Sequence, residues 1–131
     1  MKVSIDFDGT LSRNDVQNFT KRLVDDGVEV WVVTSRYSDE SARIRAWWWI
    51  IDQNKNLFKV AEECGIKKDN IIFTNGDDKI NILQGKNFLF HLDDDVDELM
   101  IILGSEDKCK PLNVNHSDWE VNCLEVLNKK P

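Results

Sequence analysis

Short apolar stretches alternate with segments of helical spacing along the whole chain, and this alternation constrains the fold most strongly. Five stretches have the character of strands, and they lie at residues 3–5, 28–34, 71–73, 88–92 and 111–114. The other segments predict helices at residues 14–25, 38–52, 57–64, 80–83, 96–103 and 117–127. Such alternation predicts an α/β fold: a three-layer, doubly wound and mostly parallel sheet of about five strands, Rossmann-like, with helices on both faces.

Local signals place the ends of two of these helices. Ser38 precedes two acidic residues, which favours a helix beginning there and running to about residue 52. Ser117 and Glu120 have the spacing of a capping box. We expect that box to open the last helix, whose core face would carry Val121, Leu124 and Leu127.

Three consecutive tryptophans, Trp47, Trp48 and Trp49, fall inside the helix expected at residues 38–52. Successive helical residues point about 100° apart, so three neighbours cannot all be buried against one surface. The simpler interpretation is that two lie in the core and one is exposed. The alternative is that this region forms a contact between subunits of a homo-oligomer, or a platform for a substrate.

The chain has 131 residues, which suits a single domain spanning residues 1–131 with one hydrophobic core. Twenty-four acidic and seventeen basic residues give a net charge of −7. Such a surface repels polyanions, so broad binding to nucleic acid or to anionic membranes is not expected. The charge does not exclude a phosphorylated ligand at one local site where a metal cation mediates.

Cysteine usage and the apolar runs bear on the compartment. The three cysteines, Cys64, Cys109 and Cys123, are widely spaced and odd in number, which favours reduced thiols over a disulfide framework. No signal peptide fits the first residues. The longest apolar run, residues 46–51, is far too short to span a membrane. We therefore expect a cytoplasmic protein with no membrane partner.

Polar groups gather where four of the predicted strands end. They occupy residues 6–10, 34–36, 77–79 and 93–95. Because the carboxyl ends of parallel strands meet at one edge of a sheet, we expect these groups to lie close together. Their carboxylates suit a hard divalent cation, while the lysine, the hydroxyls and the backbone N–H groups suit the oxygens of an anion.

The segment 6–10 reads Asp-Phe-Asp-Gly-Thr and resembles the DxDGT motif of the haloacid dehalogenase-like (HAD) phosphohydrolases. Residues 32–34 resemble the second motif of that family, an apolar strand that ends in Thr or Ser. Lys79 resembles the lysine of the third motif, and residues 90–94 resemble the fourth, an apolar strand that ends in paired acids. The resemblance covers nearly the whole chain and is most specific in the first motif.

This resemblance implies a role for each matched residue. Asp6 would be the nucleophile that forms an aspartyl-phosphate, and Asp8 the general acid and then the general base. Thr34 would donate a hydrogen bond to a phosphoryl oxygen, and Lys79 would neutralise the charge on the nucleophile and the phosphoryl group. A second acid two residues after the nucleophile is typical of the phosphatases and phosphomutases of the family.

The resemblance also implies a Mg²⁺ cofactor. Asp6, the backbone carbonyl of Asp8 and one acid of the fourth motif would hold the ion. We favour Asp94 for that acid, because it is the second of the pair, and Asp93 is the second choice. Asp95 or Asp97 could serve through water, and we expect the remaining acids of this run to stabilise a helix N-terminus.

Four further residues at the strand ends are candidates for binding the phosphorylated substrate: Gly9, Thr10, Ser35 and Arg36. Gly9 has no side chain and allows the backbone to approach the phosphoryl group closely. Arg36 could instead pair with the acids at 39 and 40. Lys79 could be a solvated lysine, and His91, inside a strand, is more often a core residue than a ligand.

Only 44 residues separate Thr34 from Lys79, which leaves room for a small helical elaboration but not for a cap domain. We therefore expect an open site in a minimal phosphatase. Its substrate would be a small phosphometabolite, a nucleotide or a phosphorylated nucleic-acid end. The rival function is a non-catalytic phospho-acceptor or regulatory domain, and phosphotransfer to another acceptor is a third option.

Overall fold

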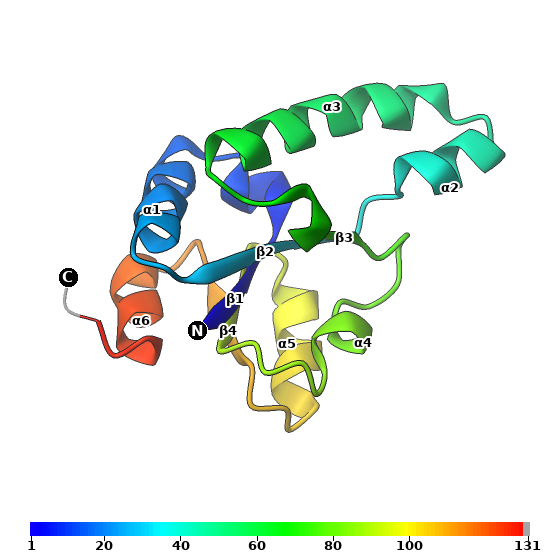
Figure 1. Cartoon of the computed structure of the whole chain (residues 1–131). Coiled ribbons are helices and arrows are strands. Elements are labelled where there is room, and N and C mark those ends of the chain that lie inside the picture. Colours follow the sequence, from blue (N-terminus) through cyan, green and yellow to red (C-terminus); the bar gives the residue numbers. More distant parts are fainter. Residues whose placement is uncertain (130–131) are drawn as a thin grey trace.

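A computed structural model describes residues 1–129 and contains a five-stranded parallel sheet (Figure 1). Its strands are β1 (Lys2–Ile5), β2 (Glu29–Thr34), β3 (Ile71–Phe73), β4 (Phe90–Asp93) and β5 (Lys110–Asn113). They lie side by side in the order β3-β2-β1-β4-β5, and every neighbouring pair is parallel. The predicted α/β class and strand number are therefore confirmed.

Helices cover both faces of the sheet. The helices are α1 (Asn14–Asp25), α2 (Asp39–Ile44), α3 (Trp48–Glu63), α4 (Ile80–Leu83), α5 (Val96–Gly104) and α6 (Trp119–Val126). Two short helical turns, η1 (Phe7–Leu11) and η2 (Lys68–Asn70), flank β1 and β3. None of the helices in residues 1–129 is both long and apolar enough to cross a membrane.

The two faces have separate hydrophobic cores, and β2 shows how one strand serves both. Val30 and Val32 pack in a cluster with α1, α3 and α6, whereas Val33 packs in a second cluster with α4 and α5. Successive residues of a strand point to opposite faces, so a continuous apolar run is what a sheet covered on both sides requires. This is the physical reason that the run at residues 28–34 predicted a buried strand correctly.

The helix expected at residues 38–52 is two helices, because the chain turns at Arg45–Trp47. Ala46 has a φ of 56°. Its N–H donates to the carbonyl of Arg43, and that of Trp47 donates to the carbonyl of Ala42. This pair of bonds is the Schellman arrangement that ends a helix, in which glycine usually takes the left-handed position. Here an alanine takes it, so the sequence carries no signal for the break.

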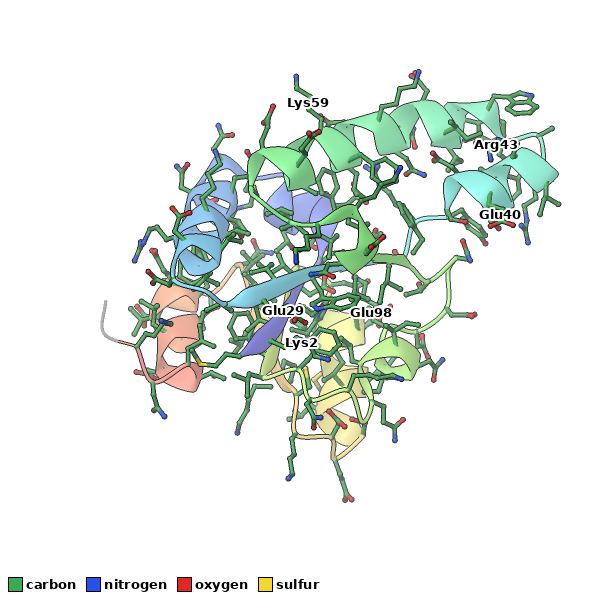
Figure 2. All side chains as sticks on the ribbon, viewed as in Figure 1. Lys2, Glu29, Glu40, Arg43, Lys59 and Glu98 are labelled. Atoms are coloured by element: carbon green, nitrogen blue, oxygen red, sulfur yellow. The ribbon has the colours of Figure 1, made fainter. Side chains whose placement is uncertain are left out.

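This turn also determines how far each of the three tryptophans is buried. Trp47 is half-buried and packs edge-on against Tyr37, while Trp48 and Trp49 are 60% and 58% exposed. The expectation that two of the three lie in the core is wrong. α2 and α3 form a helical hairpin that extends past β3 at the edge of the sheet (Figure 1), with charged residues such as Glu40 and Arg43 on its exposed surface (Figure 2).

The capping box expected at the start of the last helix does not form. Asp118 takes the N-cap position of α6, and no side chain caps that helix. The core face of α6 also differs from the predicted one. Leu124 and Leu127 are buried as expected, but Val121 is exposed and Cys123 is buried instead.

Ala46→Gly should stabilise the fold. A left-handed conformation costs an alanine about 1–2 kcal/mol, and a glycine at this position removes that cost. Part of the resulting gain in stability is offset because glycine has greater conformational freedom in the unfolded chain. We expect the free energy of unfolding to rise by about 0.5–1 kcal/mol in urea denaturation. The matched control is Ala61→Gly inside α3, which should lower it by about 1 kcal/mol. A loss of stability in Ala46→Gly would contradict the assigned turn.

Candidate active site

The residues expected to carry chemistry lie where the strand order reverses. The chain runs outward from β1 to β2 and β3, then returns to place β4 on the other side of β1. At such a switch point the connections leave in opposite directions, which opens a crevice at the carboxyl ends of the two strands. Asp6 follows β1, and Asp93 and Asp94 end β4 or follow it directly.

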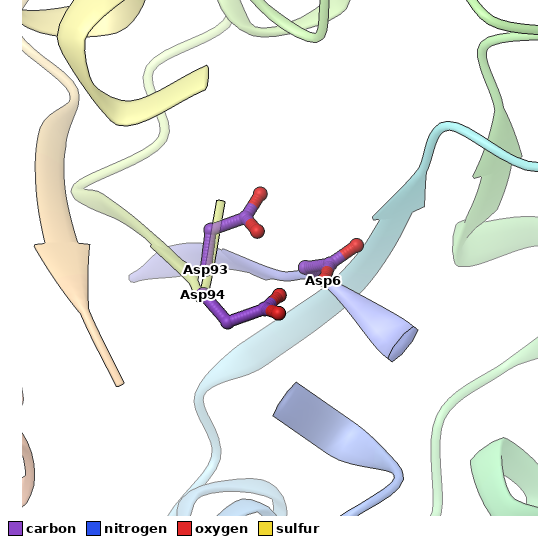
Figure 3. A group of neighbouring side chains, drawn as sticks. All are labelled: Asp6, Asp93 and Asp94. Atoms are coloured by element: carbon purple, nitrogen blue, oxygen red, sulfur yellow. The ribbon is translucent and has the colours of Figure 1, made fainter. Parts of the chain in front are cut away.

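Three carboxylates meet at the carboxyl ends of these two strands (Figure 3). Asp6, Asp93 and Asp94 each offer one oxygen, and these oxygens all lie within 4.8 Å of one another. Asp6 and Asp93 are buried and Asp94 is half-buried. Carboxylate oxygens at this spacing are a donor set that a hard divalent cation such as Mg²⁺ prefers. The residues present therefore fit such an ion.

The hydrogen bonds distinguish the two acids of β4. Asp93 Oδ2 accepts from Lys79 Nζ and His91 Nε2, and its Oδ1 accepts from the backbone N–H of Asp95. Both oxygens of Asp93 are therefore engaged. Asp94 accepts one long hydrogen bond, from Thr10 at 3.3 Å. The oxygens of Asp94 thus have more lone pairs available to a cation than those of Asp93, which supports the choice of Asp94 as the preferred ligand.

The segment after β1 brings a glycine directly against Asp94. In η1, Gly9 has a φ of 73°, and a Cβ atom placed on it would lie 2.4 Å from Oδ2 of Asp94. Any side chain at this position would displace the carboxylate. The Thr10 hydroxyl lies 3.4 Å from Oδ2 of Asp6 and 3.3 Å from Oδ1 of Asp94, and so bridges two of the three acids.

Lys79 lies inside the cluster rather than in solvent. Its Nζ is 2.8 Å from Oδ1 of Asp6 and 2.6 Å from Oδ2 of Asp93, and the residue is 2% exposed. The alternative of a solvated lysine is therefore wrong. Its position is set by α4, which begins at the next residue, and by its backbone N–H, which donates to Glu98 of α5.

One ammonium cannot neutralise two buried carboxylates, and the pKa values of the two acids diverge as a result. Burial raises the pKa of Asp6 to about 8, an effect that Lys79 opposes and the charge of Asp93 reinforces. Burial acts in the same direction on Asp93, but the hydrogen bond from His91 and the charge and hydrogen bond of Lys79 outweigh it and lower its pKa. Asp93 therefore holds the negative charge, and a cation beside Asp6 would favour the ionised nucleophile.

Arg36 forms a two-pronged ion pair with Asp8. Its Nη2 and Nε donate to the two oxygens of Asp8 at 2.7 and 2.8 Å, and its guanidinium lies over the Phe7 ring. The third nitrogen, Nη1, donates to the backbone carbonyl of Gln53 in α3. Arg36 thus pairs with Asp8 and not with the acids at 39 and 40.

Two predicted residues stay outside the carboxylate cluster. Thr34 is fully buried, and its hydroxyl oxygen accepts the backbone N–H of Arg36 at 3.2 Å. Ser35 is exposed. Within residues 1–129 no hydrogen bond joins either side chain to the three acids. Asp95, a candidate for a water-mediated contact, caps α5 by accepting from the N–H groups of Asp97 and Glu98, as expected for acids at a helix N-terminus.

Two polar residues behind the cluster were not predicted to belong to it. Ser4 Oγ lies 2.8 Å from His91 Nδ1, and His91 Nε2 lies 2.7 Å from Asp93. The available signal was a serine and a histidine at single positions inside otherwise apolar strands.

Comparison of the chain with protein-family models, with curated proteins and with solved structures finds no match. Its relation to the HAD phosphohydrolases therefore stays a prediction made from the motifs, and the site is defined by its own residues.

Gly9→Ala tests the contact between Gly9 and Asp94. The added methyl group would push Asp94 away from Asp6, so the affinity for Mg²⁺ or Mn²⁺ should fall by about tenfold or more in calorimetric titration. Gly85→Ala is the matched control, since Gly85 has a similar φ of 72° but open space around it. That variant should carry only the conformational cost of about 1–2 kcal/mol and bind the cation normally. Unchanged affinity in Gly9→Ala would exclude Asp94 as a ligand.

Proposed function

We propose that this protein is a divalent-cation-dependent phosphomonoester hydrolase that works through an aspartyl-phosphate on Asp6. The observation that carries the proposal is the buried Asp6 carboxylate, which contacts the Lys79 ammonium at 2.8 Å and shares a donor set with Asp94. Two residues further on, Asp8 supplies a second, exposed carboxylate. A nucleophile, a fixed cation, a cation site and a proton carrier are what phosphoryl transfer to water requires.

The two chemical steps divide between Asp6 and Asp8. In the first, a carboxylate oxygen of Asp6 forms a bond to phosphorus as the ester P–O bond breaks, and Asp8 gives its proton to the leaving oxygen. In the second, Asp8 takes a proton from water, the water oxygen bonds to phosphorus, and the acyl-phosphate bond breaks. Inorganic phosphate leaves and both carboxyl groups return to their starting states.

Lys79 and the cation have complementary electrostatic roles. The Lys79 ammonium stabilises the negative charge that Asp6 and the phosphoryl oxygens share as the new bond forms. A Mg²⁺ ion held by Asp6, Asp94 and the Asp8 backbone carbonyl would orient the phosphoryl group and reduce its repulsion from Asp6. Gly9, which has no side chain, lets the backbone lie directly against Asp94, and the Thr10 hydroxyl lies at hydrogen-bond distance from both Asp6 and Asp94.

Arg36 holds Asp8 through both of its oxygens. We infer that Arg36 orients the acid for proton transfer, and that a phosphorylated substrate competes for the exposed part of the Arg36 side chain, which is 21% accessible. Bidentate pairing fixes the plane of a carboxylate as well as its position. Arg36 would thus contribute both to substrate binding and to catalysis.

The substrate class stays a choice among small phosphometabolites, nucleotides and phosphorylated nucleic-acid ends. The net charge of −7 favours a substrate recognised at this metal-bearing edge and not along an extended surface. The exposed Trp48 and Trp49 keep both roles predicted for them, a subunit contact and a substrate platform. A cytoplasmic location is in keeping with the three free cysteines, all of them buried.

One observation favours the rival function, a phospho-acceptor that does not turn over. Both oxygens of Asp8 accept hydrogen bonds from Arg36, so only their remaining lone pairs can take part in proton transfer. If those lone pairs do not face the substrate and the attacking water, the aspartyl-phosphate on Asp6 would form but would not be hydrolysed. Mass spectrometry after incubation with acetyl phosphate separates the two functions, since a stable 80-Da adduct without phosphate release would identify the acceptor.

Asp6→Asn should abolish turnover. The amide is a poor nucleophile, so the rate of aryl phosphate hydrolysis with Mg²⁺ should fall by about a thousandfold or more, while circular dichroism shows an intact fold. Asp8→Asn should slow turnover and allow the acyl-phosphate to accumulate. Asp69→Asn, at an exposed acid in η2, is the control and should keep full activity. Undiminished hydrolysis in Asp6→Asn would refute the proposed function.

Arg36→Lys and Arg36→Ala should lower kcat by about 10- to 100-fold, because neither side chain can hold Asp8 in two places. In an Asp8→Asn background, Arg36→Ala should lower kcat no further, since its effect runs through Asp8. Arg43→Ala removes an exposed arginine of α2 and should be neutral (Figure 2). Additive losses of kcat in the double variant would contradict the positioning role.

A further inference from the structure

A chain of buried polar side chains runs from the interior of the sheet to Asp6. Ser4 in β1 and His91 in β4 are partners in the sheet register, and neither has any exposed surface. From there the contacts continue from His91 to Asp93, from Asp93 to Lys79 and from Lys79 to Asp6, at 2.6–2.8 Å throughout. Each link is short enough for a strong hydrogen bond.

The position of these residues in their strands makes them unusual. Val3 and Ile5 on either side of Ser4 pack in the cluster with α1, α3 and α6, and so do the two neighbours of His91. Because side chains alternate along a strand, Ser4 and His91 point to the opposite face, which α4 and α5 cover. Apolar residues would fill such positions without the cost of burying polar groups.

The donors and acceptors fix the direction of every hydrogen bond. Lys79 can only donate, so Asp93 Oδ2 accepts from it, and Oδ1 already accepts from the backbone of Asp95. An ionised Asp93 also accepts from His91, which must then carry its hydrogen on Nε2. With the hydrogen on Nε2, the other ring nitrogen, Nδ1, is the acceptor for the Ser4 hydroxyl, which lies 2.8 Å away.

We propose that His91 is a positioning residue for the reaction at Asp6: by donating its Nε2–H to Asp93, and with its tautomer held by Ser4, it fixes the carboxylate that aims the Lys79 ammonium at Asp6. Oδ2 of Asp93 then has a second donor, held rigidly in β4, beside the flexible Lys79 side chain, and the carboxylate cannot rotate without breaking that bond. Lys79 then has one defined anchor and directs its charge to the nucleophile. Without that donor, Asp93 can turn, and Lys79 can move away from Asp6.

This inference rests on the proposed function for its catalytic meaning, but the hydrogen-bond chain can be tested without turnover. The rival explanation is a histidine that merely satisfies a serine in the core. Under that explanation the rate would follow stability, and any side chain that packs well would serve. Under the positioning role, kcat depends on whether the side chain at residue 91 places a hydrogen-bond donor where His91 Nε2 lies.

Two amide side chains separate the explanations. The side-chain nitrogen of Gln comes near the place of Nε2, whereas that of Asn comes near the place of Nδ1. We expect His91→Gln to keep kcat within about threefold of the wild type and His91→Asn to lose about 10- to 100-fold, with KM unchanged in both. The double variant Ser4→Ala/His91→Leu should lose as much kcat as His91→Asn, because it too places no donor at the position of Nε2.

Nuclear magnetic resonance of the ¹⁵N-labelled protein gives the readout that needs no activity. His91 should be protonated at Nε2, and the buried Lys79 ammonium should give a signal that His91→Gln retains and His91→Asn shifts or loses. Equal kcat and equal Lys79 signals in the Gln and Asn variants would overturn the inference, as would protonation of His91 at Nδ1. A wild type without phosphatase activity would refute the proposed function, and the Lys79 signals would then decide the positioning role alone.

Discussion

The buried ammonium of Lys79 is the interaction on which the carboxyl edge of the sheet depends. Asp6 and Asp93 come from neighbouring strands, and burial removes the hydration of both carboxylates. Without a cation between them, nothing would offset that loss or their mutual repulsion. A buried charge left without its partner costs about 3–5 kcal/mol. Lys79 arrives from the segment before α4, so this one side chain ties the connection that follows β3 to the two strands at the switch point. Asp6, Lys79 and Asp93 are all buried, so the site lies partly inside the protein core.

Much of the fold follows from residue patterning. The β-branched run before Thr34 predicts a strand covered on both faces, and alternation of strands with helical segments predicts a parallel sheet. Once the strands are parallel, their carboxyl ends share an edge, so the convergence of Asp6, Lys79 and Asp94 follows from topology. The assignment of chemistry to that edge comes from the motif that begins at Asp6, and it remains a prediction that the experiments above test.

The features that sequence reasoning missed depend on contacts that no local pattern encodes. Ala46 ends a helix in a conformation that glycine usually adopts. Because no glycine marks the position, the local sequence does not indicate that the helix ends there or that Trp48 and Trp49 are exposed. The partner of Arg36 could not be chosen because nearby acids and Asp8 are equally plausible until the backbone is folded. His91 looked like an ordinary core residue, since its meaning depends on an acid two residues later and on a lysine from another segment.

Arg36 connects two parts of the molecule that are otherwise separate in the sequence. One edge of its guanidinium donates two hydrogen bonds to Asp8, and the remaining nitrogen donates to the carbonyl of Gln53 in α3. This rigid, planar group is hydrogen-bonded on both sides. Any shift of the helical hairpin at Gln53 must therefore either lengthen these hydrogen bonds or move Asp8 with it. The hairpin, which extends past the edge of the sheet, is in this way mechanically linked to Asp8, the exposed carboxylate two residues after Asp6.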